Sequence, residues 1–276
     1  MRIKIEPRLT STWKLSVAIP FFSLAAALFS GGVFLFFMGV SPLQAYRAII
    51  TSALGDTYGL SETVVKAIPL IMAGIAVMLS FTMLIWNIGA EGQIFMGAIA
   101  ATAMVRFFYS DSRIVMLLLM FLAAAAAGGT WAAIAGYFRA KWNVNEIITT
   151  LMLNYVAMNF LNYFVFGPWR DPSSLGFPMT PPFPDSARLP VFWGTRIHGG
   201  IFLALLLPLL FWIVLKFTRW GYEIRVMGEN PKAAGFAGMN YLKNVVLVMF
   251  ISGAIAGIAG MCELAGLQGR LQHGFS

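Results

Sequence analysis

Residues 114–138 read IVMLLLMFLAAAAAGGTWAAIAGYF and contain no charged side chain. As an α-helix this run would extend for roughly 37 Å, at about 1.5 Å per residue. The hydrocarbon core of a bilayer is roughly 30 Å thick. The stretch is therefore long enough and apolar enough to be a transmembrane helix.

The composition of the chain extends this interpretation to the rest of the sequence. Of 276 residues, 59% are hydrophobic and 11% are charged, whereas a soluble domain carries about 25% charged residues. The formal net charge of +8 comes from Lys and Arg residues that lie between apolar runs. Since they form no continuous basic face, a nucleic-acid interface is not indicated. We expect an all-α, polytopic transmembrane helical bundle in a single domain, 1–276.

Seven apolar segments are long enough to cross a membrane. They cover residues 17–38, 68–86, 88–105, 114–138, 147–166, 201–217 and 245–265. The first follows basic residues, as a secretion signal does. Its length of about 20 residues and the lack of a small-residue cleavage site favour a retained span. The segment 39–67 mixes apolar and polar residues at helical spacing, so we expect it to lie along the membrane interface.

Basic residues between the spans predict the orientation, because Lys and Arg accumulate on the cytoplasmic side of membrane proteins. A cytoplasmic N-terminus places these residues inside: Arg2, Lys4, Arg8, Lys14, Arg139, Lys141, Lys216, Arg219, Arg225, Lys232 and Lys243. The other side carries Arg47, Lys66, Arg106, Arg113, Arg170, Arg188 and Arg196 over a greater length. We therefore expect a multi-pass protein of the cell (inner) membrane with its N-terminus in the cytoplasm.

The stretch 167–190, GPWRDPSSLGFPMTPPFPDSARLP, is too rich in proline to form a continuous helix. The predicted orientation places it outside the membrane. It either faces a binding protein or serves only as a connector between two spans.

Sequence features of catalysis are not found. The dipeptide Gly-Lys does not occur, so the chain has no Walker A motif to bind ATP phosphates. His198 and His273 lack the spacing of metal ligands. Cys262 is the single cysteine, which excludes an intramolecular disulfide. We expect no enzyme activity, no metal and no cofactor.

The first segment that indicates function is WNIGAEGQIFMGAIAA, residues 86–101. Asn87, Glu91 and Gln93 interrupt a long apolar region. An ionised carboxylate at membrane depth is unfavourable by roughly 2.5 to 3.5 kcal/mol, so it normally faces protein or water. The segment is expected to be a broken helix that lines a substrate pathway. The alternative is a tight turn in which Asn and Gly serve only turn geometry.

The second segment is WGYEIRVMGENPKAAGFAGMNYLKN, residues 220–244, in the long connection 216–244. Asn230 is a favourable N-cap and Pro231 suits the first helical position. A short helix is expected over Lys232–Ala237, ending near Gly238. A helix this short is unstable alone, so it must dock, either on a partner or on the chain's own helix ends.

The third segment is ISGAIAGIAGMCELAGLQGR, residues 251–270. Gly253 and Gly257 form a GxxxG pattern that allows close helix packing. Glu263 follows the apolar run, with Arg270 as its expected charge partner. This carboxylate is a second candidate for the substrate pathway. The alternative is an interfacial carboxylate at the end of the span.

These segments resemble the permease subunits of ABC importers for simple sugars and nucleosides, a group that includes the ribose permeases and the purine-nucleoside permeases of basic-membrane-protein systems. The matching motifs are NIGAEGQ at 87–93, GENPKAAGFAGM at 228–239 and ELAGLQGRLQHGFS at 263–276. The order of the motifs also agrees, and the likeness covers essentially the whole chain. Relatives continue past the Gly-Phe-Ser motif, so the resemblance implies that the family's C-terminal helices are not present here.

The resemblance implies a permease that translocates a nucleoside or simple sugar with ATP hydrolysed by a partner. The expected partners are a cytoplasmic ATP-binding subunit, a second permease in a homo- or heterodimer, an extracytoplasmic solute-binding protein and the lipid bilayer. NIGAEGQ is closer to the nucleoside-type members. The residues expected to couple to the ATPase are Glu229, Asn230, Pro231, Ala233, Ala234 and Gly238.

Two other classes of membrane protein fit the sequence less well. An ion-coupled secondary transporter would also use broken helices, but only Glu91 and Glu263 are plausible intramembrane carboxylates. An intramembrane enzyme would need a nucleophile with a base, or a metal triad, and the sequence shows neither.

Overall fold

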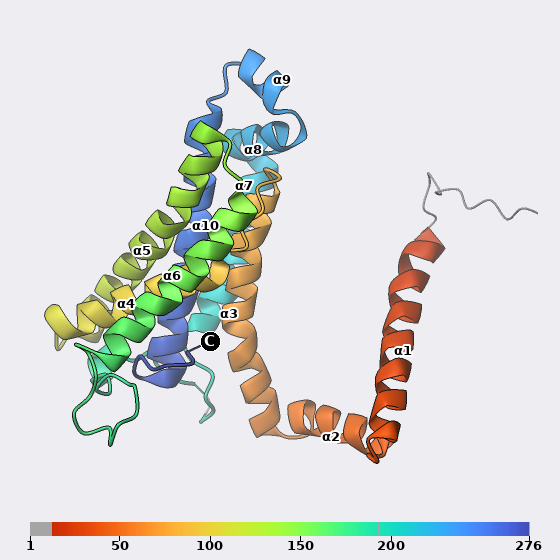
Figure 1. Cartoon of the computed structure of the whole chain (residues 1–276), viewed down its shortest axis with the longest axis vertical. Coiled ribbons are helices and arrows are strands. Elements are labelled where there is room, and N and C mark those ends of the chain that lie inside the picture. Colours follow the sequence, from red (N-terminus) through yellow and green to blue (C-terminus); the bar gives the residue numbers. More distant parts are fainter. Residues whose placement is uncertain (1–12, 193, 276) are drawn as a thin grey trace, which may run out of the picture. The chain divides into compact units, whose positions relative to one another are not determined.

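The computed structural model describes residues 13–192 and 194–275, and it is helical (Figure 1). The longer helices are α1 (Trp13–Phe37), α2 (Pro42–Leu54), α3 (Thr57–Phe81), α4 (Ala90–Phe107), α5 (Arg113–Trp142), α6 (Glu146–Phe166), α7 (Gly200–Phe217), α8 (Arg219–Glu229), α9 (Pro231–Phe236) and α10 (Tyr241–Glu263). Short helical turns are η1 (Asp185–Ala187) and η2 (Leu264–Gln268). In the described ranges β-structure is confined to isolated bridges. The predicted all-α class is therefore confirmed. Arg2, Lys4 and Arg8, on which part of the orientation prediction depends, lie outside the described residues.

Each predicted apolar run falls on a helix, and five ranges are long and apolar enough to cross a membrane. They are Val17–Phe37, Thr57–Phe81, Arg113–Trp142, Gly200–Phe217 and Tyr241–Gln268. Helices α4 and α6 contain more polar residues and do not meet this criterion. The structure thus supports a multi-pass helical membrane protein with five candidate spans in the described part of the chain.

Helix α3 differs in its bounds from the expected segment 68–86. It begins at Thr57 and ends at Phe81. Its first turns, before the expected segment, contain Glu62 and Lys66, each of which forms an ion pair with a later part of the chain. After the helix, Leu84 has φ +54°, and the chain turns back there. The segment 39–67 therefore supplies α2 and the first turns of α3.

The chain divides into two compact units, 1–60 and 61–276. In the described part of the smaller unit, α1 and α2 pack through Tyr46. Its hydroxyl donates a hydrogen bond of 2.6 Å to the backbone oxygen of Leu28. A Cβ on Gly31 would lie 3.1 Å from that hydroxyl, so the glycine makes room for Tyr46.

In the larger unit, α10 packs against α4 and α5 through glycines (Figure 1). A Cβ on Gly97 of α4 would stand 2.3 Å from the backbone oxygen of Gly257, and one on Gly128 of α5 would stand 2.3 Å from that of Gly253. The helix backbones are therefore in direct contact, as small residues allow in membranes. The predicted packing role of Gly253 and Gly257 is confirmed.

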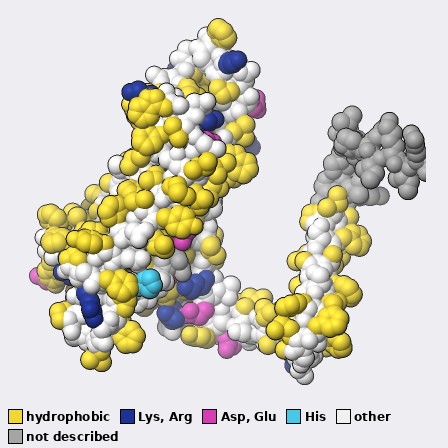
Figure 2. Space-filling model, in the orientation of Figure 1, with side chains coloured by type: hydrophobic (Ala, Val, Ile, Leu, Met, Phe, Trp, Pro, Cys, Tyr) yellow, Lys and Arg dark blue, Asp and Glu magenta, His cyan; other side chains and the backbone are white. Residues whose placement is uncertain are grey.

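At one end of this unit the proline-rich segment 167–190 is fixed to the C-terminal residues. The π-helical turn η2 is followed by Gly269, whose φ of +64° reverses the chain. The backbone N–H of Thr180 then donates to Leu271 O at 2.8 Å, and that of Phe183 donates to Gly269 O at 2.7 Å. Helices α8 and α9 lie at the opposite end (Figure 1). Lys and Arg side chains gather near both ends, and hydrophobic side chains dominate the surface between them (Figure 2).

Candidate translocation and coupling sites

Two amides lie buried near α10, one in the segment between α3 and α4 and one in the first turn of α4. Asn87 and Gln93 are each 1% exposed. Their side chains form reciprocal hydrogen bonds of 3.1 and 2.8 Å. Asn87 Nδ2 also donates to the hydroxyl of Ser252, at 2.9 Å, and that hydroxyl donates to the backbone oxygen of Ala76, at 2.6 Å. Both amides are thus satisfied by groups of the same chain.

Helix α6 contributes two polar residues that sequence analysis did not single out. The side chain of Asn154 accepts from the backbone N–H of Gly92 at 2.9 Å and donates to the backbone oxygen of Ile88 at 3.0 Å. Glu146 is buried and lies 3.3 Å from the guanidinium of Arg139. The sequence does not separate Asn154 from Asn159 and Asn162, the other amides of this helix. The hydrogen bonds of Asn154 satisfy backbone groups at Ile88 and Gly92, where the chain enters α4, as an apolar interior requires.

Glu91 lies apart from the two amides. It is in the first turn of α4, where a helix N-terminus favours a carboxylate, and its side chain is exposed. No hydrogen bond or ion pair joins it to other described residues. Two residues apart on a helix, Glu91 and Gln93 point in nearly opposite directions. The three predicted pathway residues of this segment are therefore divided between an interior cluster and an outward carboxylate.

Glu263 lies at the far end of α10, eleven residues or roughly 16 Å along the helix from Ser252. Its side chain is 7% exposed, and Oε1 is 3.6 Å from Lys66 Nζ. The predicted pairing of Glu263 with Arg270 is wrong, because the Arg270 guanidinium approaches the sulfur of Met179 instead. The π-helical turn and Gly269 direct Arg270 away from Glu263. Because Lys66 is far from Glu263 in the sequence, the sequence pattern did not identify it as the partner.

His198 precedes α7 and is fully buried. Its Nδ1 accepts from the backbone N–H of Gly200 at 3.2 Å. A Cβ on Gly266 would stand 2.3 Å from the ring, so that glycine makes room for the imidazole. Burial lowers the pKa of His198 from 6.5 to about 4. The ring is therefore neutral near pH 7 and packs η2 against the start of α7.

The predicted short helix is α9. The side-chain oxygen of Asn230 accepts from the backbone N–H groups of Lys232 and Ala233, at 3.1 Å each, and Pro231 is in the first turn. The predicted N-cap is confirmed. The helix ends at Phe236, slightly earlier than expected.

The exposure of α9 distinguishes the side chains that face outward from those that pack on the chain. Ala234, one of the residues expected to couple to the ATPase, is 1% exposed and packs on its own chain. Phe236 is 96% exposed, and Ala233 is exposed beside it. The helix therefore docks on its own chain through Ala234 and presents Phe236 outward.

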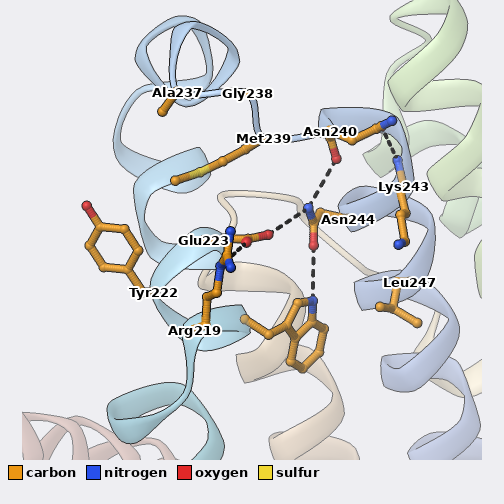
Figure 3. A pocket seen from close by; sticks show the side chains of 11 residues that line it. Arg219, Tyr222, Glu223, Ala237, Gly238, Met239, Asn240, Lys243, Asn244 and Leu247 are labelled. Atoms are coloured by element: carbon orange, nitrogen blue, oxygen red, sulfur yellow. Dashed lines mark hydrogen bonds and ion pairs between the residues drawn. The ribbon is translucent and has the colours of Figure 1, made fainter.

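A pocket of about 460 Å³ lies where α8, the α9–α10 connection and the start of α10 meet (Figure 3). Asn244, 6% exposed, forms part of its wall. Its side-chain oxygen accepts from Trp220 Nε1 at 3.0 Å, and its Nδ2 donates to Glu223 Oε2 at 3.4 Å. The sequence offered no signal for this arrangement, because α8 and α10 are adjacent only in the folded chain.

Residues 59–275 match the family described as "Branched-chain amino acid transport system / permease component". A glucose ABC transporter permease protein of Haloferax volcanii is 37% identical, over 100% of this chain and 75% of the relative. A guanosine ABC transporter permease protein of Bacillus subtilis is 33% identical, over 89% of this chain and 71% of the relative. A nucleoside ABC transporter permease protein of Lactococcus lactis is 25% identical, over 89% and 70%. No solved structure matches the chain.

Members of this family are membrane components of transporters and not catalytic subunits. They act in general with an ATP-binding subunit and a solute-binding protein. The apolar helices and the match over residues 59–275 agree with this class. This chain therefore belongs to the branched-chain amino acid transport system permease family and is a membrane permease of an ABC importer of the simple sugar and nucleoside type.

Proposed function

We propose that this permease translocates a nucleoside or a simple sugar along a surface formed by Glu91 and the outer face of α6. The observation that carries the proposal is a row of hydrogen-bonding side chains on that face. Tyr155 and Tyr163 are 55% and 64% exposed, and Asn159 between them is also exposed. Because they recur every four residues, the three side chains share one side of the helix.

Helix α7 provides the comparison. Its exposed side chains include Phe202, Leu205, Leu206, Leu209 and Ile213, all apolar, as expected of a surface that faces lipid. Polar side chains in a membrane helix instead face protein or a water-filled cavity. The α6 face also carries exposed apolar side chains such as Met152, but its row of two tyrosines and an asparagine, which the exposed side chains named for α7 lack, suits a polar route.

The chemistry of the α6 face fits the proposed solutes. Phenol rings offer flat surfaces for a base or a sugar ring, and phenol and amide groups hydrogen-bond to hydroxyls. Asn159 Nδ2 donates to the backbone oxygen of Tyr155 at 2.8 Å, which leaves its side-chain oxygen to accept from a solute. The relatives named for glucose, guanosine and nucleosides support the same solute class.

The other predicted pathway residues have separate places in this proposal. Asn87 and Gln93 hold the start of α4 in place from behind the route. Glu263 lies near its outer end, beside Lys66. Glu91 is the carboxylate that faces the solute.

The proposed topology has seven spans, α1, α3, α4, α5, α6, α7 and α10, within one permease domain, 1–276. The protein lies in the inner membrane of the cell. Its N-terminus and the connection 216–244 lie in the cytoplasm. The basic residues that precede the first span in the sequence, together with those at the α8–α9 end, support this orientation. The segment 167–190 then faces the solute-binding protein.

Helix α9 is the proposed contact with the ATP-binding subunit. Asn230, Pro231 and Gly238 define its ends, since Gly238 has φ +78°. Exposed Glu229 and Ala233, together with Phe236, form the docking surface. Ala234 supports the helix from below. A second permease, identical or related, completes the membrane part.

Thiol labelling tests the route. In a Cys262→Ala background, Asn159→Cys should react with a water-soluble thiol reagent, and guanosine or glucose should protect it. Leu206→Cys on the exposed face of α7 is the matched control and should stay unreactive. Equal failure of both positions to react would place the α6 face in lipid and refute the route. Reaction without protection by either solute would refute the solute class.

A further inference from the structure

Helix α8 is held against α10 by a small group of polar side chains. Trp220 and Glu223 lie three residues apart on α8 and therefore on the same side of it. Both bond the amide of Asn244, which lies one turn into α10, and Asn244 Nδ2 also donates to the backbone oxygen of Asn240 at 3.1 Å. Glu223 Oε1 is 3.5 Å from Arg219 Nε. Figure 3 shows the side chains of Arg219, Glu223 and Asn244 pointing toward one another.

The amide of Asn244 has its donors and its acceptor engaged. Asn240 in turn caps α10, accepting from the backbone N–H of Lys243 at 2.9 Å. The short connection 237–240 joins α9 to this fixed point. The pocket of about 460 Å³ separates the connection from α8. Side-chain hydrogen bonds therefore hold α8 to α10 across a region that is not closely packed.

Helix α10 also reaches the middle of the larger unit. Eight residues beyond Asn244, the hydroxyl of Ser252 accepts from Asn87 and donates to the backbone oxygen of Ala76. The same helix thus contacts α8 near one end and the non-helical segment before α4 at its centre.

We propose that Asn244 is a positioning residue that transmits displacement of α9 to α10. Movement of α8 and α9 on engagement of the ATP-binding subunit would pull on Trp220 and Glu223, and through Asn244 on the helix that contacts Asn87. This inference rests on the proposed docking role of α9. It assigns to Asn244 a role in coupling and none in solute contact.

The test exchanges the amide and the carboxylate between positions 244 and 223. Asn244→Asp keeps an acceptor for Trp220 but places a carboxylate against Glu223. Adding Glu223→Gln restores a donor–acceptor pair across the same contact. In the full transporter, Asn244→Asp should lower solute uptake and solute-stimulated ATP hydrolysis about tenfold, and the double variant should recover most of it, because contacting sites are coupled. Glu223→Gln alone is the matched control.

Two further measurements separate coupling from folding and from docking. Membrane abundance and co-purification of the ATP-binding subunit should stay normal in Asn244→Asp. If the variant does not accumulate in the membrane, Trp220→Phe replaces it, since it removes the indole N–H and keeps a ring. Unchanged stimulation in whichever variant accumulates overturns the proposal, as does a double variant no better than Asn244→Asp. Failure of Phe236→Cys to cross-link to the ATP-binding subunit in wild-type background would instead refute the docking role of α9.

Discussion

Replacing Gly97 with alanine is expected to separate α4 from α10. The added Cβ would stand 2.3 Å from the backbone oxygen of Gly257 and 2.4 Å from its Cα. Favourable carbon contacts lie near 3.5 to 4.0 Å, so the two backbones would have to part by roughly 1 Å. Overpacking of this kind destabilises by about 1 to 3 kcal/mol.

A second glycine on an exposed helix surface gives the matched control. Gly74 in α3 has no atom within 4 Å of an added Cβ, so Gly74→Ala should gain roughly 1 kcal/mol from helix propensity alone. Both substitutions gain this helix propensity, so the two variants should differ by the overpacking alone, about 1 to 3 kcal/mol in free energy of unfolding. Unfolding of the purified protein in detergent micelles, followed by circular dichroism, measures the difference. Equal stability of Gly97→Ala and Gly74→Ala would refute the direct backbone contact between α4 and α10.

Three other predictions follow from the described contacts. Asn230→Ala should destabilise the start of α9 by about 0.5 to 2 kcal/mol, measured as faster amide exchange over that helix, with no change in α6. Lys66→Met should lower stability by leaving the buried carboxylate of Glu263 without its cation, and adding Glu263→Gln should recover it; a double variant as unstable as the single one would contradict the ion pair. Because burial lowers the pKa of His198 to about 4, the unfolded chain binds the proton more readily. Stability should therefore fall as pH decreases from 6.5 towards 4, and a His198→Gln variant that kept the same pH dependence would exclude this residue as its source.

Several local features of the chain followed from the sequence because they depend on neighbouring residues. The cap at Asn230 and Pro231 in the first turn of α9 are properties of a few adjacent residues. The packing role of Gly253 and Gly257 followed from spacing on one helix. Helix geometry also implies that Glu91 and Gln93 diverge, although both had been assigned to one pathway.

Contacts across the fold were not accessible in the same way. Asn87 donates a hydrogen bond to Ser252 on α10, and Glu263 forms an ion pair with Lys66 on α3. In each case the partners are far apart in the sequence. Several other polar residues could have formed the same interaction, and composition does not distinguish among them. The burial of Ala234 is similar, because its surroundings come from tertiary packing and not from α9 itself.

Helices α7 and α10 show that hydropathy does not predict how deeply a helix is buried in the protein. Their apolar windows have the same mean hydropathy, 2.4, yet 17% of the α7 window and 72% of the α10 window is buried inside the protein. The sequence by itself determined that both are apolar helices, because lipid and a protein interior select the same side chains. Tertiary structure decided that α10 lies at the centre, where glycines such as Gly257 let α4 and α5 approach its backbone. Hydropathy measures transfer out of water, whereas position within the membrane depends on the shape of the neighbouring helices.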